Sequence, residues 1–464
     1  MTEKSNVASP SVAQPSLLRK ITVWVPVLAW VAFRVLDKGD FTPYSCALAG
    51  FNCPDPTSTV SGFVAPEYAH VKDLMLDNII KGDDVGAGVA LYVDGQLKMD
   101  MYAGWMDRET NLVYTNETLQ MVFSCSKAMT GIVIARLVDK GHLSYDQTIA
   151  TYWPEFAQGN KENVTLKDLM EHAGGVAWLE QPLKVDDFKD REKFSSRLAA
   201  QPHNWNGTKT RAYHALTRGW YLNEIVRRVD PQHRTIGQIA REEINHPYNV
   251  EWHYNPGPEM DHRIATPYHT SMHQLVRRMV TPAWLWKIAE PVPEAFLGTT
   301  QNNSPGKRAI IEAAPEKRNI LLLQKSDLRR YESPSFSGHT NARSIAKMAA
   351  MMANRGQPIE NGEPSLLSAN TFDYATTTDM TDMDEVLKIN PSLTVGGWGV
   401  IEMFNTTFMG WTGAGGSLFY WNEEFKIGFG YCMNSYRYTL GGDRRSKRML
   451  EAIVTELRRQ KENK

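Results

Sequence analysis

The chain of 464 residues carries 51 Lys and Arg against 52 Asp and Glu, a formal net charge of -1, with 42% hydrophobic and 22% charged residues. Affinity for phosphate backbones comes from clustered Lys and Arg, so this balance argues against a generic nucleic-acid binder. The composition also excludes a disulfide scaffold, a collagen and a multi-pass membrane protein. Because one hydrophobic core usually serves about 250–300 residues, we expect two lobes or a large domain with insertions.

The first 36 residues are expected to lie outside the globular body. Residues 1–20 are polar and rich in Ser and Pro, which indicates a disordered tail. Residues 21–36 form an apolar run after Arg19-Lys20, typical of a single-pass signal anchor or an uncleaved secretory signal, although membrane spans need about 17–25 residues. We therefore expect a membrane-anchored or secretory-pathway protein. The alternative is a cytoplasmic protein with an amphipathic or core-docked N-terminal helix.

Residues 37–64 are interpreted as a linker that contains two of the four cysteines. Cys46 and Cys53 lie in a segment with Pro and Gly and could pair in an oxidising compartment, whereas Cys125 and Cys432 have apolar neighbours and are expected to be buried free thiols. Five N-x-S/T sequons are compatible with a lumenal body, although roughly two or three would arise by chance. Their asparagines are Asn116, Asn163, Asn206, Asn302 and Asn405.

The two ends of the remaining chain show matching patterns. Apolar residues at three-to-four spacing predict a helix from Pro66 to Gly82, and alternation on both sides of Asp94-Gly95 predicts a β-hairpin. A second hairpin is predicted around Asn422, followed by an amphipathic helix over residues 449–457. Strands from both ends would most economically form one antiparallel sheet covered by these terminal helices.

The stretch between these ends reads mostly as helix. We therefore expect one domain over residues 65–460, made of a sheet lobe (about 65–120 and 390–460) and a helical lobe (about 121–389). A cleft between two lobes is a favoured place for a small-molecule site.

An S-x-x-K sequence, Ser124 to Lys127, precedes an apolar helical pattern. Positions i and i+3 share a helix face, so the serine hydroxyl and lysine amine would be neighbours, and a lysine whose pKa is lowered can activate a serine. The motif occurs twice more in the chain. The copy at Ser304 contains Pro-Gly and is interpreted as a loop, and the copy at Ser344 as a solvated face of a helix capped by Thr340.

Two further segments carry candidate functional groups. Tyr213 precedes an amphipathic helix; beside a lysine ammonium its pKa would be lowered and it would relay protons, although such a tyrosine is more often a packing residue. The Gly-rich run that starts at Gly410 is interpreted either as a strand edge where a ligand approaches the backbone or as a bulged turn. His172 and His214, close to these motifs, are expected to be structural.

Ser124-Cys125-Ser126-Lys127, Tyr213 with its following helix, and Trp411-Thr412-Gly413 before a hairpin resemble, in that order, the three motifs of the serine β-lactamase and penicillin-binding-protein superfamily. The class C branch, which includes the family VIII carboxylesterases, matches best. The resemblance covers roughly residues 65–460. It implies an α+β, β-lactamase/transpeptidase-like fold, with an antiparallel sheet flanked by terminal helices, a mostly helical lobe, and the active site in the cleft between them.

The resemblance also implies residue roles. Ser124 would be the nucleophile that forms an acyl-enzyme, Lys127 its base and Tyr213 the proton shuttle. The backbone N–H groups of Ser124 and Ala414 would form the oxyanion hole on an edge that includes Trp411 and Gly413. The twelve histidines show no metal-ligand spacing, so no metal and no cofactor are predicted. The expected partner is a small-molecule ester or amide, and the oligomeric state is not predicted.

Two departures from the family pattern bear on the substrate. Lactamases usually have Lys or His where this chain has Trp411, and an Asn where it has Ala215, so a cation and an amide that hold β-lactam or peptide substrates are missing. A neutral ester is therefore the expected substrate. The alternatives are a β-lactamase or D-aminopeptidase-type amide hydrolase, and a non-catalytic scaffold of the same fold. The segment from about Trp284 to Arg330 is expected to shape the acyl pocket as a lid.

Overall fold

The computed structural model describes most of the chain after the N-terminal tail. The described residues are 38–51, 59–181, 183–271, 301–317, 327–437 and 441–463, with 25–28, 30, 53, 274 and 439. The predicted disordered tail, most of the predicted anchor and much of the predicted lid lie outside these residues. Within the described part of the chain, no helix is both long and apolar enough to cross a bilayer.

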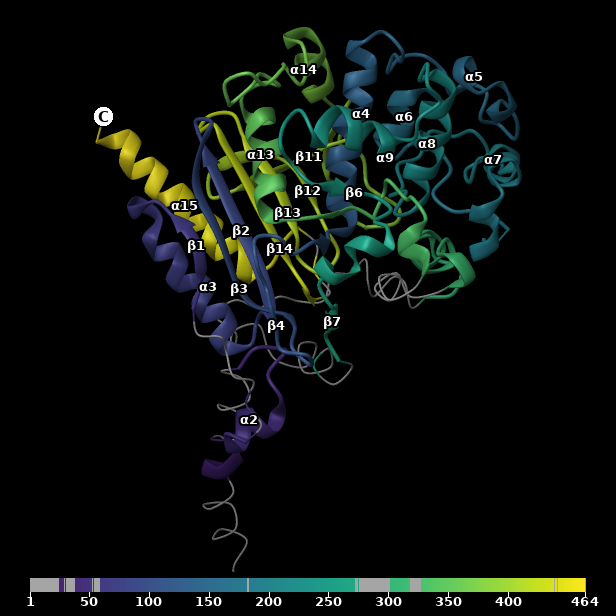
Figure 1. Ribbon diagram of the computed structural model, residues 1–464. Coiled ribbons are helices and arrows are strands. Elements are labelled where there is room, and N and C mark those ends of the chain that lie inside the picture. The colour runs from purple at the N-terminus through teal and green to yellow at the C-terminus, as the bar shows by residue number, and fades with distance from the viewer. Residues whose placement is uncertain are drawn as a thin grey trace, which may run out of the picture.

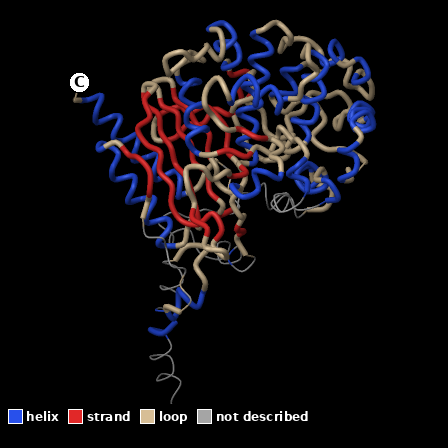
Figure 2. Tube along the Cα trace, viewed as in Figure 1, coloured by secondary structure: helices blue, strands red, loops and turns tan. Residues whose placement is uncertain are grey.

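A single large sheet forms one side of the molecule, and every pairing in it is antiparallel (Figures 1 and 2). Its order is β1-β3-β2-β14-β13-β12-β11-β10-β9, with β4 paired to β3. The strands are β1 (Ser61–Val64), β2 (Gly86–Val93), β3 (Gln96–Asp107), β4 (Leu112–Val113), β9 (Thr378–Met380), β10 (Ser392–Thr394), β11 (Gly399–Met403), β12 (Thr406–Thr412), β13 (Leu418–Asn422) and β14 (Ile427–Met433).

The two hairpins predicted from the sequence meet at the centre of this sheet. Strand β2 pairs with β14 from Ala87 opposite Met433 to Val93 opposite Ile427. Hairpin β2–β3 turns at Asp94-Gly95, where both residues have positive φ, as that tight turn requires. The N-terminal and C-terminal parts of the domain therefore share one hydrogen-bonded layer, as expected.

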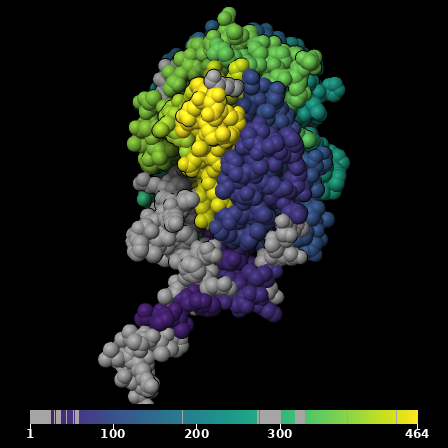
Figure 3. Space-filling model, turned by 90° about the vertical axis from the view of Figure 1, so that its left-hand side faces the viewer, coloured from purple at the N-terminus to yellow at the C-terminus, as the bar shows by residue number. Residues whose placement is uncertain are grey.

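Helices cover both faces of the sheet. Helix α3 (Ala69–Lys81) and helix α15 (Arg444–Glu462) lie side by side on one face (Figure 3). Helix α13 (Ala342–Ala353) packs on the other face, against β14, β2 and β13. The segment expected as the helical lobe, residues 121–389, therefore also contributes to the sheet lobe. It contains α13, which covers one face of the sheet, and the edge strand β9.

The remaining helices gather beside the sheet as a second lobe (Figure 1). They are α4 (Ser126–Asp139), α5 (Ile149–Tyr152), α6 (Leu166–Met170), α7 (Arg191–Ala200), α8 (Thr217–Val229), α9 (Ile236–Ile239), α12 (Pro305–Lys307) and α14 (Ala369–Thr376). Helix α2 (Tyr44–Ala49) lies apart from this lobe, below the sheet in Figure 1. Short 3-10 or π-helical turns are η1 (Pro66–Tyr68), η2 (Phe123–Cys125), η3 (Pro154–Phe156), η4 (Val185–Lys189), η5 (Ala240–Asn245), η6 (Pro258–Arg263), η7 (Arg308–Glu312), η8 (Pro315–Lys317) and η10 (Asp327–Arg330).

Small pairings of short strands join the two lobes. Strand β8 (His339–Thr340) pairs with β5 (Gln120–Met121) and β6 (Trp252–His253), and β15 (Ser435–Tyr436) pairs with β7 (Tyr268–His269). Because β5 leads directly into η2 and α4, and α4 contacts both α8 and β12, the start of α4 lies where the lobes meet.

Cys46 and Cys53 form a disulfide within the segment expected as a linker. Their Cα atoms are 4.6 Å apart, and the two other cysteines, Cys125 and Cys432, are free and buried, as the sequence predicted.

Candidate active site

Ser124 occupies the tight turn η2 immediately before α4. Its neighbours Phe123 and Cys125 are buried, whereas Ser124 itself is half-buried. Phe123 has a φ of 44°, an uncommon conformation for a bulky residue, and the preceding Val122 N–H donates to the Gly338 carbonyl at 2.9 Å. Strained backbone of this kind is concentrated at functional sites, because surrounding contacts must hold it in place. The turn thus leaves the Ser124 residue partly exposed and buries its two neighbours.

Lys127 lies one helical turn beyond Ser124, as the i,i+3 spacing predicts. Its Nζ is 3.3 Å from Ser124 Oγ and donates to the carbonyls of Ala215 at 2.8 Å and Ser335 at 2.9 Å. Burial, aided by the positive charge of Arg218, lowers the pKa of Lys127 well below its usual value. The lysine is therefore a candidate general base, because a lowered pKa favours the neutral amine.

Tyr213 completes this group from the loop before α8. Its Oη lies 2.6 Å from Ser124 Oγ, and Lys127 Nζ lies 4.8 Å from the centre of its ring. Burial raises the pKa of Tyr213 to about 12, so the sequence-based expectation of a lowered pKa was wrong. Burial raises the pKa of Tyr213 more than the nearby positive charge of Arg218 lowers it. In addition, Lys127, which was expected to be an ammonium, has a lowered pKa that favours the neutral amine.

The Gly-rich strand end brings the third predicted motif to the same place. Trp411 lies at the end of β12 and stacks on Tyr213, with ring centres 6.1 Å apart at 20°. A Cβ on Gly413 would approach the Val122 carbonyl to 2.2 Å, so only glycine allows β12 to end against the turn that carries Ser124. Ala414 is half-buried, and its N–H donates to no acceptor among the described residues.

Arg218 is a site residue that the sequence analysis missed. It is fully buried in α8, donates to the carbonyls of Met170 at 2.9 Å and Lys127 at 3.3 Å, and its Cζ lies 5.6 Å from the ring centre of Trp411. A cation therefore lies behind the neutral indole. Its sequence signal was its i, i+4, i+7 spacing with Leu222 and Ile225, which puts an arginine on the apolar face of the helix.

Asp384 and Ser335 were also missed, and both position the predicted residues. Asp384 Oδ1 accepts from the N–H of Tyr213 at 3.1 Å, and also from the N–H groups of Val386 and Leu387, while Ser335 offers its carbonyl to Lys127 and its hydroxyl to the Gly219 N–H at 2.7 Å. Neither residue lies in a periodic pattern or near a motif. No signal in the sequence singled them out.

The two histidines near the motifs, His172 and His214, are buried and accept hydrogen bonds from backbone N–H groups. The Val176 N–H donates to His214 Nε2 at 3.1 Å, and the His214 N–H donates to His172 Nδ1 at 3.0 Å. Burial lowers the pKa of His214 to about 3 and that of His172 well below its usual range. These bonds agree with the structural role expected from the sequence.

Cys125 offers no second nucleophile. Its thiol is fully buried and donates to the Trp411 carbonyl at 3.5 Å, and burial raises its pKa well above the usual value. Within the described residues, no cluster of His, Cys, Asp or Glu suits a metal ion.

The two other S-x-x-K copies differ from their predicted settings. Ser304 accepts from the Lys307 N–H at 3.1 Å and caps the short helix α12, so its segment is not a plain loop. Ser344 is buried rather than solvated, because it accepts from the Glu251 N–H at 2.9 Å, and Asn341 rather than Thr340 caps α13. Lys347 pairs with Glu360 and Glu363 instead of with the serine. Both copies are structural.

A sequence model of the Beta-lactamase family matches residues 74–453, so the chain belongs to this family. Among solved structures, it is similar to a penicillin-binding-protein homologue from Caulobacter crescentus (27% identity, TM-score 0.71) and to a family VIII carboxylesterase (25% identity, TM-score 0.72). Each likeness covers 86% of this chain and 100% of the other. The β-lactamase/transpeptidase-like fold expected from the sequence is confirmed.

Curated relatives combine esterase and lactamase names. The chain is 28% identical over 313 residues to the esterase/beta-lactamase LipL of Mycobacterium tuberculosis, covering 67% of this chain and 68% of LipL. It is 30% identical over 149 residues to the human mitochondrial serine beta-lactamase-like protein LACTB, covering 31% of this chain and 27% of LACTB. For a teichoic acid D-alanine hydrolase of Staphylococcus aureus the identity is 27% over 157 residues, 34% of this chain and 36% of the relative. Membership of this family, with esterases among its neighbours, supports hydrolase function.

Proposed function

We propose that this protein hydrolyses a neutral ester through an acyl-enzyme on Ser124. The observation that carries the proposal is that Ser124 Oγ lies 2.6 Å from Tyr213 Oη and 3.3 Å from Lys127 Nζ, in a setting that lowers the pKa of Lys127. Nucleophile, base and acid within hydrogen-bonding reach are the requirements of covalent acyl transfer.

The partners of Lys127 favour its role as the base. A neutral amine has two hydrogens and one lone pair, and the carbonyls of Ala215 and Ser335 accept both hydrogens. The lone pair is then left for the Ser124 hydroxyl. Lys127 takes the Ser124 proton as Oγ attacks the ester carbonyl carbon, and the N–H groups of Ser124 and Ala414 stabilise the oxyanion.

Tyr213 supplies the proton in the second half of acylation. With its pKa raised to about 12, the phenol keeps its proton at neutral pH. When the ester C–O bond breaks, Tyr213 gives that proton to the departing alcohol oxygen, and the Lys127 ammonium returns its proton to the phenolate. Water then attacks the acyl-enzyme with the same groups acting in reverse, which releases the carboxylic acid and restores the Ser124 hydroxyl.

The residues around Trp411 favour a neutral ester over a β-lactam. The indole offers no charge to a substrate carboxylate, and the cation behind it, Arg218, is fully buried and engaged with backbone carbonyls. At position 215 the chain offers a methyl group in place of an amide, and the Ala215 carbonyl is already bound to Lys127. The groups that would hold an anionic or acylamino substrate are thus neutral or occupied.

Labelling with a fluorophosphonate tests whether Ser124 is a nucleophile. We expect the folded protein to be labelled, the Ser124→Ala variant to lose labelling, and the Ser304→Ala variant, which changes another S-x-x-K serine, to retain it. A folded wild-type protein that is never labelled would leave the scaffold alternative.

Substrate preference is tested separately by comparing p-nitrophenyl butyrate with nitrocefin. We expect kcat/KM for the ester to exceed that for nitrocefin by at least about tenfold. The reverse ranking would favour the β-lactamase or D-aminopeptidase alternative.

We also propose that the domain lies in an oxidising, secretory compartment. The Cys46–Cys53 disulfide supports this, because such bonds persist outside the reducing cytosol. Four of the five sequon asparagines, Asn163, Asn206, Asn302 and Asn405, are exposed, as glycan attachment requires.

A further inference from the structure

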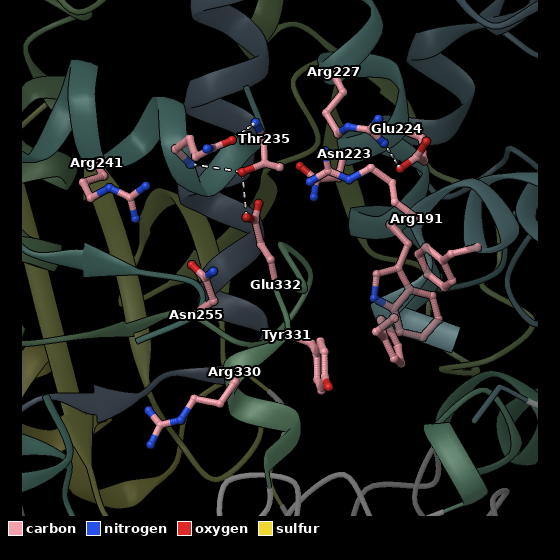
Figure 4. Close-up of a pocket in the computed structure, with 14 residues that line it drawn as sticks. Arg191, Asn223, Glu224, Arg227, Thr235, Arg241, Asn255, Arg330, Tyr331 and Glu332 are labelled. Atoms are coloured by element: carbon pink, nitrogen blue, oxygen red, sulfur yellow. Dashed lines mark hydrogen bonds and ion pairs between the residues drawn. The ribbon is translucent and has the colours of Figure 1, made fainter. Parts of the chain in front are cut away.

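A cavity lies in the helical lobe, on the far side of α8 from Lys127. Its volume is about 310 Å³, within the range of small-molecule sites, and α7, α8, α9, η5 and residues 330–332 enclose it (Figure 4). The residues Trp220, Asn223, Glu224 and Arg227 line it at the i, i+3, i+4, i+7 spacing of one helix face. The proposed reaction uses none of the residues that line it.

One wall of this cavity is aromatic. The ring of Phe188 lies 5.7 Å from that of Trp220 and 5.5 Å from that of Tyr331, and Phe194 packs 5.9 Å from Trp220. Phe188 and Tyr331 are half-buried, whereas Trp220 is only 2% exposed and packs behind them, so the two half-buried rings carry most of an apolar surface suited to a flat, unsaturated group.

The rest of the lining carries a surplus of positive charge. Arg227 pairs with Glu224 at 2.7 Å and Arg330 with Asp261 at 2.6 Å. Arg191 and Arg241, in contrast, form no ion pair with any residue in the described part of the chain. Figure 4 shows Arg191 and Arg227 across the cavity from Arg241 and Arg330. Two guanidinium groups with five donors each are therefore available to a ligand.

The one carboxylate at the centre of the cavity is already satisfied. Glu332 accepts from Thr235 Oγ1 at 2.7 Å and from the Gly237 N–H at 2.7 Å (Figure 4). Arg241 is near enough for its charge to act on Glu332 but forms no ion pair with it, and Arg191 has no carboxylate partner among the described residues. A ligand that brings its own negative charge would compensate them.

We propose that this cavity binds a small aromatic carboxylate, with its ring on the wall formed by Phe188, Trp220 and Tyr331 and its carboxylate on Arg191 or Arg241. The volume limits the ligand to a small molecule, the wall selects a flat apolar body, and the arginines select an anion. Guanidinium groups bind carboxylates bidentately, which fixes the orientation of the bound molecule.

The cavity is connected to the candidate active site by two elements. Helix α8 presents Trp220 to the cavity and Arg218 to Lys127, and Glu332 is three residues before Ser335, whose carbonyl binds Lys127. Any effect of a bound carboxylate on turnover would pass through these two elements. An effect on turnover rests on the proposed ester hydrolysis, whereas the binding of the ligand to this cavity is independent of it.

Calorimetric titration of the purified chain with 2-naphthoate tests binding, with 2-naphthamide as the uncharged analogue and inorganic phosphate as an anion without a ring. We expect 2-naphthoate to saturate with a Kd of about 1 mM or tighter, and both comparison ligands to bind at least about tenfold more weakly. At least one of the variants Arg191→Gln and Arg241→Gln should weaken binding of 2-naphthoate about tenfold, and that variant identifies the arginine that holds the carboxylate. Arg459→Gln, which removes an exposed arginine at the end of α15, should not.

Three results would overturn the proposal: no saturable binding of 2-naphthoate, equal binding of 2-naphthamide, or unchanged affinity in both cavity variants. Equal affinity for phosphate would overturn the role of the aromatic wall. Arg191 and Arg241 are both exposed, and thermal unfolding of each variant verifies that it is folded. If ester turnover is absent but the binding pattern holds, the proposed function fails while the cavity assignment stands.

Discussion

Lys127 shows how one residue acquires its chemistry from its surroundings. An exposed lysine is an ammonium at neutral pH, but this one is buried, faces two carbonyls and lies near the buried cation Arg218. Burial and like charge both disfavour the ammonium, so the pKa of Lys127 falls. If the neutral amine is the base, activity appears as the pH rises through this lowered pKa.

Replacing Arg218 is expected to move that pH dependence. Arg218→Met removes a positive charge near Lys127, so the pKa of Lys127 rises and the ascending limb of kcat/KM for p-nitrophenyl butyrate shifts to higher pH. At pH 7 we expect a loss of about tenfold or more, because less of the lysine is neutral. The measurement is the pH profile of the variant and the wild type.

Arg218→Lys is the graded comparison, because a lysine buried at this place keeps a cation only in part. Its ascending limb should lie between those of Arg218→Met and the wild type even if the overall rate falls. Identical pH limbs in Arg218→Met and wild type would contradict the electrostatic role of Arg218 and leave it a purely structural residue.

At the scale of elements, the contact between α13 and β14 decides how closely helix and sheet approach. Gly428 and Gly430 of β14 face α13, where an added Cβ would meet the Ala350 nitrogen at 2.2 Å and the Ala342 carbonyl at 2.3 Å. Tyr431 points to the other face and donates to Asp84, which binds Arg445 of α15. Period-two alternation thus gives β14 a glycine face for one helix and a side-chain face for another.

Gly428→Ala is expected to destabilise the protein. The new methyl group would collide with backbone atoms of α13, which cannot turn aside as a side chain can, so overpacking should cost about 1–3 kcal/mol. The measurement is the urea midpoint of unfolding.

Gly399→Ala serves as its comparison, because Gly399 also lies in the sheet but its nearest neighbour to a new Cβ is at 3.4 Å. We expect Gly399→Ala to shift the midpoint far less. Equal losses in the two variants would mean that strand propensity, rather than the contact with α13, sets the cost.

At the scale of the whole molecule, a buried ionic cluster joins the two ends of the domain. Arg445, fully buried at the start of α15, donates to Asp84 before β2 at 2.8 Å and pairs with Asp443. Arg437 pairs with Asp83 from the C-terminal side. Together with the β2–β14 pairing, these bonds make folding of the sheet lobe depend on segments more than 300 residues apart.

Expression through a eukaryotic secretory pathway tests the proposed compartment. We expect the chain, with its own N-terminal segment, to carry N-glycans, because Asn163 and Asn206 lie in exposed turns. Peptide N-glycosidase treatment should increase gel mobility, and Asn163→Gln or Asn206→Gln should each remove one mobility step. An unglycosylated chain whose Cys46 and Cys53 react with an alkylating reagent before reduction would contradict the proposal.

The local parts of the site were predictable from the sequence. Ser124 and Lys127 are close because three residues make nearly one helical turn, and the hairpins follow from period-two alternation on both sides of turn residues. Tyr213 and Trp411 were found by resemblance, since 89 residues separate Ser124 from Tyr213 and no local rule spans that distance. The structure brings all four together.

The sequence by itself determined which segments become helix or strand and which side chains are available for chemistry, because periodicity and turn preferences act over a few residues. Only the tertiary structure decided the directions in which the pKa values of Lys127 and Tyr213 shift, the placement of Arg218 behind Trp411, and the support from Asp384 and Ser335. Those properties depend on burial and on contacts between distant segments. Burial is decided only when helices and sheet pack together and exclude water.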